Sequence, residues 1–342
     1  MILGGKLMLL REHLNRFTKE ELLIKAKIFG LKKYSGLNKT ALINHFVTSL
    51  CEEGLIRRRL VCLTKEQMAF FRKACNAPQN LSLEMVDDVL QLIKGMLGFI
   101  DDDAKRFFVF EEVAEAYKGF NDEKFKTEQF KKGWMVKCLH FFRLFYGIAP
   151  LEVIYKLYKL KVKDSIDDMI DILLEMPIDV VEANIYDMDE LGFVDWPTYD
   201  PLYSYEGLIL DFSLSDDDDL DDLLKKQMGK DFYIPSIQQI EEIRKIGYEQ
   251  SVMAYKRLEK FFANNLHMTY DMVYIFCLSV WVQSYDGNSP TTLIDKLAEH
   301  NIVFDDESQL EEFVRLLMDA HNNTRMKENR GHTPFEIMKK YM

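Results

Sequence analysis

The sequence predicts a mainly α-helical protein built from more than one domain. The chain has 342 residues, which is more than a single compact domain usually holds. Helical periodicity recurs along most of it, and capping boxes, in which Ser or Thr precedes Glu or Gln by three residues, mark several helix starts. A β-hairpin pattern occurs in one place, where Val180–Tyr186 and Gly192–Trp196 flank a tight turn.

We expect the chain to divide into four parts. In order they are a basic helical head (1–60), a helical middle domain (61–212), an acidic linker (213–235) and a C-terminal helical bundle (236–342). In the head, the capping box Thr18–Glu21 predicts a helix that ends at Gly30, and an extended segment follows. A second helix should begin near Asn38, since Leu42, Phe46 and Leu50 then share one face.

The rest of the chain is also mostly periodic at helical spacing. In the middle domain we predict helices over 64–74, 83–96, 130–146, 150–160 and 165–175. The linker has a leucine pattern that allows a brief helix around Leu220–Leu224. In the C-terminal bundle we predict a long helix over 236–264 and further helices over 269–285, 290–300 and 307–320.

Charge is distributed unevenly along the chain. Residues 1–60 contain twelve Lys and Arg but five Asp and Glu, although the net charge of the whole chain is -12. Between Asp164 and Asp222 there are twenty acidic residues and no basic one. Binding of a polyanion should therefore be local to the head, and the acidic stretch should attract the head and compete for its lysines.

The head resembles a known nucleic-acid-binding module. The run Glu21-Leu-Leu-x-x-Ala-Lys-x-x-Gly-Leu31 and the later Tyr34-Ser-x-Leu-x-Lys-x-x-Leu-Ile43 are similar to the SAP-like N-terminal domain of transcription termination factor Rho. The resemblance implies binding of DNA or RNA. The residues that would contact the nucleic acid lie around the extended segment and the second helix start: Lys25, Lys32, Lys33, Tyr34 and Lys39. The alternative is a helical hairpin whose basic face docks on the acidic body.

The tail carries a second pattern. The motif Asn322-Asn-Thr-Arg325 followed by Gly331-His-Thr-Pro-Phe-Glu336 resembles the C-terminal signature of uncharacterised proteins of Gram-positive bacteria and their mobile elements. Its residues predict a structural role, because Thr333–Glu336 is a capping box with Pro at the first helical position. The alternative is an anion site formed by Arg325, Lys327 and Arg330.

Residues 130–200 combine helices with the predicted hairpin and resemble a winged helix. Its recognition helix would be Ser165–Glu175, which carries four carboxylates and no cation, so it should repel phosphates. We therefore expect a scaffold or a protein-binding surface there. The acidic stretch could also bind a protein. One form of this hypothesis is that its carboxylates imitate a nucleic-acid backbone toward a DNA-binding partner.

No residue pattern predicts catalysis, a metal site or a cofactor. The chain lacks the glycine-rich phosphate loops and the metalloprotease and nucleophile-elbow motifs. The segment Asp187–Asp195 has only part of a calcium-loop pattern and fits a hairpin turn better. Five scattered cysteines without a Cys-x-x-Cys pair, and no apolar run long enough to span a membrane, predict a cytoplasmic protein. We expect a non-enzymatic nucleic-acid-associated regulator or, alternatively, an interaction or inhibitor protein of a phage or plasmid.

Overall fold

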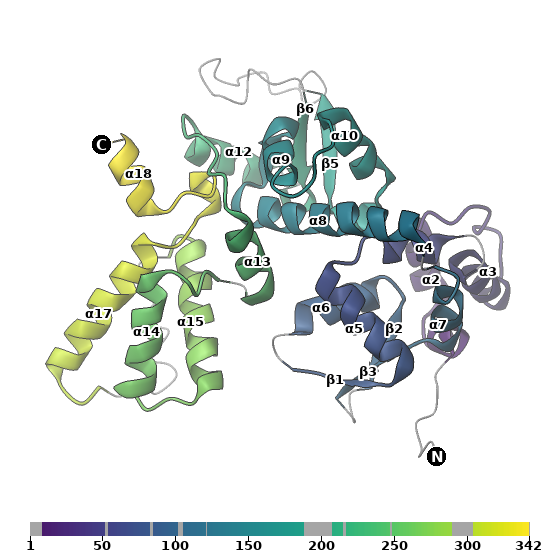
Figure 1. Cartoon of the computed structure of the whole chain (residues 1–342), viewed down its shortest axis with the longest axis horizontal. Helices are drawn as coiled ribbons and strands as arrows, with labels where there is room; N and C mark the ends of the chain where they lie inside the picture. The colour runs from purple at the N-terminus through teal and green to yellow at the C-terminus, as the bar shows by residue number, and fades with distance from the viewer. Residues whose placement is uncertain are drawn as a thin grey trace. The chain divides into compact units, whose positions relative to one another are not determined.

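The computed structural model confirms the mainly helical class. It describes residues 9–51, 54–82, 85–101, 105–120, 122–187, 207–214, 217–246, 248–288 and 304–341. Helices account for 64% of the structure, and two small three-stranded antiparallel sheets accompany them (Figure 1). The chain forms two compact units, the first from residues 1–137 and 162–182 and the second from residues 138–161 and 183–342. The four-part division expected from the sequence stays a prediction.

The first unit begins with four short helices. They are α1 (Leu10–Leu14), α2 (Lys19–Ile28), α3 (Lys39–Cys51) and α4 (Leu55–Leu60). The capping box of α2 is confirmed, because the Thr18 side chain accepts from the Glu21 amide and the Glu21 carboxylate accepts from the Thr18 amide. The helix ends at Ile28, and Gly30 follows the C-cap residue Phe29 with a φ of +67°, the left-handed conformation that glycine adopts freely.

The helical hairpin of α2 and α3 is held by its apolar face. Leu22 and Ala26 of α2 are fully buried, as are Leu42 and Phe46 of α3. These positions follow the helical spacing that the sequence shows, and burial of such a face is the main source of helix stability.

The next part of the first unit contains a sheet that the sequence analysis missed. Its strands are β1 (Gln79–Asn80), β2 (Gly98–Asp101) and β3 (Arg106–Val109), in the order β1-β3-β2. Gly98 permits this pairing, because a Cβ there would lie 2.1 Å from the carbonyl oxygen of Phe108. The strands are two to four residues long, too short to show a clear alternation.

The first unit also contains further helices. They are α5 (Lys65–Asn76), α6 (Val86–Lys94), α7 (Glu111–Tyr117), the first part of α8 (Glu123–Phe145), α10 (Ile166–Glu175) and α11 (Ile178–Val181). Of these, α5 contacts β3 and α6 contacts β2. The capping residues Thr64 of α5 and Ser165 of α10 each accept from the amide three residues on. α8 starts seven residues before the predicted position 130.

The second unit contains the other sheet, with strand order β4-β6-β5. The strands are β4 (Ile148–Pro150), β5 (Ala183–Asp187) and β6 (Gly207–Asp211), and helix α9 (Leu151–Tyr158) follows β4. β5 covers only the second part of the first strand predicted for the hairpin, because Val180 and Val181 belong to helix α11, and β5 pairs with β6. The predicted partner Gly192–Trp196 and most of the segment Asp187–Asp195 lie outside the described residues.

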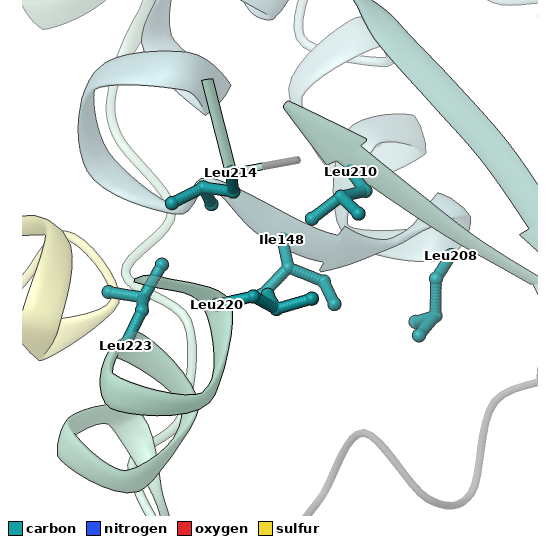
Figure 2. Close-up of a cluster of buried hydrophobic side chains, with 6 residues drawn as sticks. All are labelled: Ile148, Leu208, Leu210, Leu214, Leu220 and Leu223. Atoms are coloured by element: carbon teal, nitrogen blue, oxygen red, sulfur yellow. The ribbon is translucent and has the colours of Figure 1, made fainter. Parts of the chain in front are cut away.

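Part of the expected acidic linker is a helix packed on this sheet. α12 (Asp217–Gln227) buries Leu220 and Leu223 against Ile148 of β4 and Leu208 and Leu210 of β6 (Figure 2). The leucines follow helical spacing, so the aspartates between them fall on the opposite face.

In the described part of the second unit the other α-helices are α13 (Ile237–Ile246), α14 (Met253–Asn264), α15 (Tyr270–Tyr285), α17 (Glu307–Asn322) and α18 (Pro334–Tyr341). The single long helix expected over 236–264 is wrong, because the chain leaves the helix between α13 and α14. After α13, both the amide and the hydroxyl of Ser251 donate to the carboxylate of Glu242, which lies in α13. The Ser251 amide therefore has a side-chain acceptor in place of the backbone carbonyl that a continued helix would offer. The predicted helix over 290–300 lies outside the described residues.

Candidate nucleic-acid interface

The turn between α2 and α3 presents two of the predicted contact residues to solvent. Lys32 and Lys33 are exposed, while Leu31 just before them is buried. Lys33 has a φ of +58°, a left-handed conformation that lysine rarely adopts. No side-chain hydrogen bond or ion pair involves either lysine within the described part of the first unit, so both ammonium groups are available to an anion.

Lys25 and Lys39 are placed differently. The Lys25 ammonium lies 4.6 Å from the centre of the Phe17 ring, and Lys39 Nζ donates to the carbonyl of Asn15 at 2.9 Å. Both lysines act on Glu21: after the hydrogen bonds from Thr18, their charges help to lower the pKa of that carboxyl. Half of the predicted lysine set therefore already has partners in the head.

The start of α3 adds backbone groups to this surface. Asn38 Oδ1 accepts from the Ala41 amide at 2.9 Å, as expected of an N-cap residue. Tyr34 is half-buried, and its carbonyl accepts from the Leu37 amide, which closes the turn. The N-terminal end of a helix carries partial positive charge, so the turn and the helix start favour an anion together.

One histidine of α3, which the sequence analysis did not single out, contacts this turn. His45 Nε2 lies 2.8 Å from the carbonyl oxygen of Lys32, and its Nδ1 lies 3.5 Å from Ser49 Oγ. A histidine seven residues after an N-cap gives no recognisable motif, because its partner is a backbone carbonyl thirteen residues earlier.

The basic residues at the end of the head serve another purpose. Arg57 pairs with Glu128 at 2.7 Å, and Arg58 Nε donates to the carbonyl of Glu175 at 2.7 Å. Arg59 is 6% exposed and forms two parallel hydrogen bonds with Asp179, of 2.8 and 2.9 Å. Arg58 and Arg59 of the head thus contact Glu175 and Asp179 of the acidic stretch, whereas the alternative interpretation concerns the basic face of the α2–α3 hairpin. In the described part of this unit the arginines make these contacts, and the four predicted lysines do not.

The acidic residues predicted on a recognition helix and on the linker are mostly at the surface. α10 exposes Asp167, Asp168, Asp171 and Glu175, and α12 exposes Asp218, Asp219, Asp221 and Asp222. Asp168 caps its own helix by accepting from the Ser165 amide, and the hydrogen bonds from Ser165 lower the pKa of its carboxyl.

The tail motif forms a buried ionic cluster. Arg325 lies between Glu249, at 3.2 Å, and Glu336, at 2.9 Å, and its guanidinium stacks 3.5 Å from the centre of the Tyr233 ring. The Thr333–Glu336 capping box is confirmed, since Thr333 Oγ1 accepts from the Glu336 amide and Glu336 accepts from the Thr333 amide. Burial alone would raise the pKa of Glu336, but the His332 hydrogen bond and the Arg325 charge lower it to about 2.

This arrangement supports the structural interpretation of the tail over the anion site. Arg325 already has two carboxylate partners, and Arg330 is fully buried, with Nη1 donating to the Lys230 carbonyl. The side chain of Lys327 is half-buried, and burial lowers the pKa of its ammonium group. The three cations thus do not form an open site for an external anion.

The part of the chain that the structure describes contains neither a cluster of metal ligands nor a membrane-spanning helix. In that part of the chain, no three His, Cys, Asp or Glu side chains are grouped so that they could hold a metal ion. None of its helices is both long enough and apolar enough to span a bilayer. None of the five cysteines forms a disulfide bond in the described structure, and burial raises the pKa of Cys62 to about 12.

Comparison of the sequence with protein-family models finds no match, and comparisons with curated proteins and with solved structures find none either.

Proposed function

We propose that the protein is a non-enzymatic, nucleic-acid-associated regulatory protein whose head binds the backbone of DNA or RNA. The observation that carries the proposal is the pair Lys32 and Lys33, exposed in the turn that leads into α3. Phosphate contacts from lysines supply most of the sequence-independent affinity for nucleic acids. Lys25, Tyr34 and Lys39 would complete the interface at its half-buried side.

The arrangement of α2, the turn and α3 supports the SAP-like, Rho-type interpretation of the head. In the same proposal, residues 130–200 are a winged-helix-like scaffold, and the chain is a cytoplasmic protein of Gram-positive bacteria or their mobile elements, an interpretation that the resemblance of the tail motif supports. We call the turn between α2 and α3 that carries Lys32 and Lys33 the lysine turn. The contacts of Arg57, Arg58 and Arg59 favour binding by this turn, because the contacts that hold the head to its unit use different residues.

Binding of the full chain to short fluorescent DNA and RNA duplexes and single strands, at several salt concentrations, tests the proposal. The double variant K32E/K33E should lose most of the affinity, because two attractive charges become repulsive. The matched control is K256E/K260E, which changes the charge equally at two exposed positions of α14. Equal affinity of the wild type and K32E/K33E for every probe would refute the proposal.

A second function has its own supporting observation. The leucines of α12 are buried in the second unit, so its exposed aspartates are held on a fixed helix face rather than on a loose linker. Such a face suits a basic protein partner. In this alternative the chain is an interaction or inhibitor protein of a phage or plasmid that acts through its acidic surface. In one version of it, the acidic surface mimics a nucleic acid. Retention of a basic DNA-binding protein by the wild type but not by D218S/D219S/D221S/D222S would support it.

A further inference from the structure

The conformation of the lysine turn needs an explanation, because Lys33 lies in the left-handed region with a φ of +58°. A side chain other than glycine is strained there, since its Cβ approaches the following carbonyl. Such a residue keeps this conformation when the surrounding structure holds it, and strained residues of this kind are common at binding sites. Contacts from the neighbouring structure should therefore hold the lysine turn in this conformation.

Hydrogen bonds at both ends of the turn fix its neighbours. The Leu31 amide donates to the Ala26 carbonyl at 2.9 Å, and the Leu37 amide donates to the Tyr34 carbonyl at 3.1 Å. Between them, the Lys32 carbonyl receives its hydrogen bond from His45 Nε2 at 2.8 Å. The imidazole is therefore the direct link from α3 to the two exposed lysines.

The histidine is itself held in place. Ser49 lies one helical turn further along α3 and is 1% exposed, and its hydroxyl is 3.5 Å from His45 Nδ1. When the neutral ring carries its proton on Nε2, it donates to the Lys32 carbonyl and Nδ1 accepts from the hydroxyl. A side chain at position 45 without a donor would leave the Lys32 carbonyl without this bond, so the turn would sample other conformations.

We propose that His45 is a positioning residue for nucleic-acid binding: by holding the Lys32 carbonyl, it fixes the turn that presents Lys32 and Lys33 to the phosphates. The inference rests on the proposed function of the head. It concerns the geometry of the lysines and not their charge, and this difference can be measured.

The experiment compares H45A and H45Q in the full chain, with N44A as the control on an exposed neighbouring position of α3. The probe is the DNA or RNA strand that the wild type binds best. H45A should weaken binding by about threefold to tenfold, the effect of one lost hydrogen bond. The salt dependence should stay the same, because the number of phosphate contacts does not change. H45Q should restore binding, since its amide can donate to the same carbonyl, and N44A should bind as the wild type does.

A second measurement is independent of affinity. Hydrogen exchange of the Lys33 and Tyr34 amides should be faster in H45A than in H45Q or the wild type, while exchange in the middle of α2 stays unchanged. Unchanged binding and exchange in H45A, together with lost binding in K32E/K33E, would overturn the role of His45 and leave the proposed function intact. Unchanged binding in K32E/K33E would instead refute the proposed function itself.

Discussion

Arg59 and Asp179 face one another across 120 residues of sequence and form a bidentate ion pair with N–O distances of 2.8 and 2.9 Å. The guanidinium also stacks on Phe29, with its central carbon 3.5 Å from the ring centre. The same arginine thus touches the end of the α2 helix and the acidic segment of the first unit. The pair therefore links the head to the acidic segment within the first unit.

This pair should contribute strongly to stability. Arg59→Ala leaves the Asp179 carboxylate without its partner in a mostly buried site, and we expect it to reduce the free energy of unfolding by about 3 kcal/mol. Chemical denaturation of the full chain measures the change. Arg57→Ala is the control, because both members of the Arg57–Glu128 pair are more than one quarter exposed and should contribute less than about 1 kcal/mol. Equal effects of the two variants would contradict this account.

The left-handed conformation at position 33 predicts an unusual preference for glycine. Lys33→Gly and Lys33→Ala remove the same charge, but only glycine relieves the strain at a φ of +58°. We expect Lys33→Gly to be more stable than Lys33→Ala by about 1 kcal/mol. Thermal unfolding of the two variants decides the matter. A more stable alanine variant would mean that the turn has a different conformation in solution.

The tail cluster predicts a dependence of stability on acid. The pKa of Glu336 lies at about 2 in the folded protein, below its usual value of 4.5, so its carboxylate stabilises the fold above that usual value. This contribution should be lost as the pH falls from about 4.5 to about 2. In denaturation curves over this range, Glu336→Gln should therefore lose stability less steeply than the wild type. The control is Glu311→Gln at an exposed position of α17. Parallel curves for the wild type and Glu336→Gln would contradict the prediction.

The packing of α12 predicts different effects for neighbouring residues of one helix. Leu220→Ala removes a side chain that is 4% exposed and should cost about 2 to 4 kcal/mol. Asp219→Ser changes an exposed residue and should alter the free energy of unfolding by less than about 0.5 kcal/mol. Denaturation of both variants checks the difference. If Leu220→Ala were as mild as Asp219→Ser, this segment would behave as a linker.

The local structure of the head could be predicted because its signals are local. The Thr18 capping box, the Gly30 stop and the Asn38 start each involve residues within a few positions of one another. The exposure of Lys32 and Lys33 follows from their place in the turn between two amphipathic helices. The sequence also predicted the capping box at Thr333 correctly, for the same reason.

What the sequence by itself determined was therefore the mainly helical class, many of the helix starts and the lysine turn. Tertiary structure decided the rest. The sheet of β1, β2 and β3 depends on pairing between strands too short to show a period, and on close backbone approach at Gly98. The arginines of the head contact Glu128, Asp179 and the carbonyl of Glu175 at the end of α10, whereas Lys32 and Lys33 stay exposed. This difference depends on the tertiary structure, because these partners reach the head only when the chain folds. His45 gained its place beside Lys32 in the same way, because hydrogen bonds and ion pairs between distant residues depend on packing and have no local pattern.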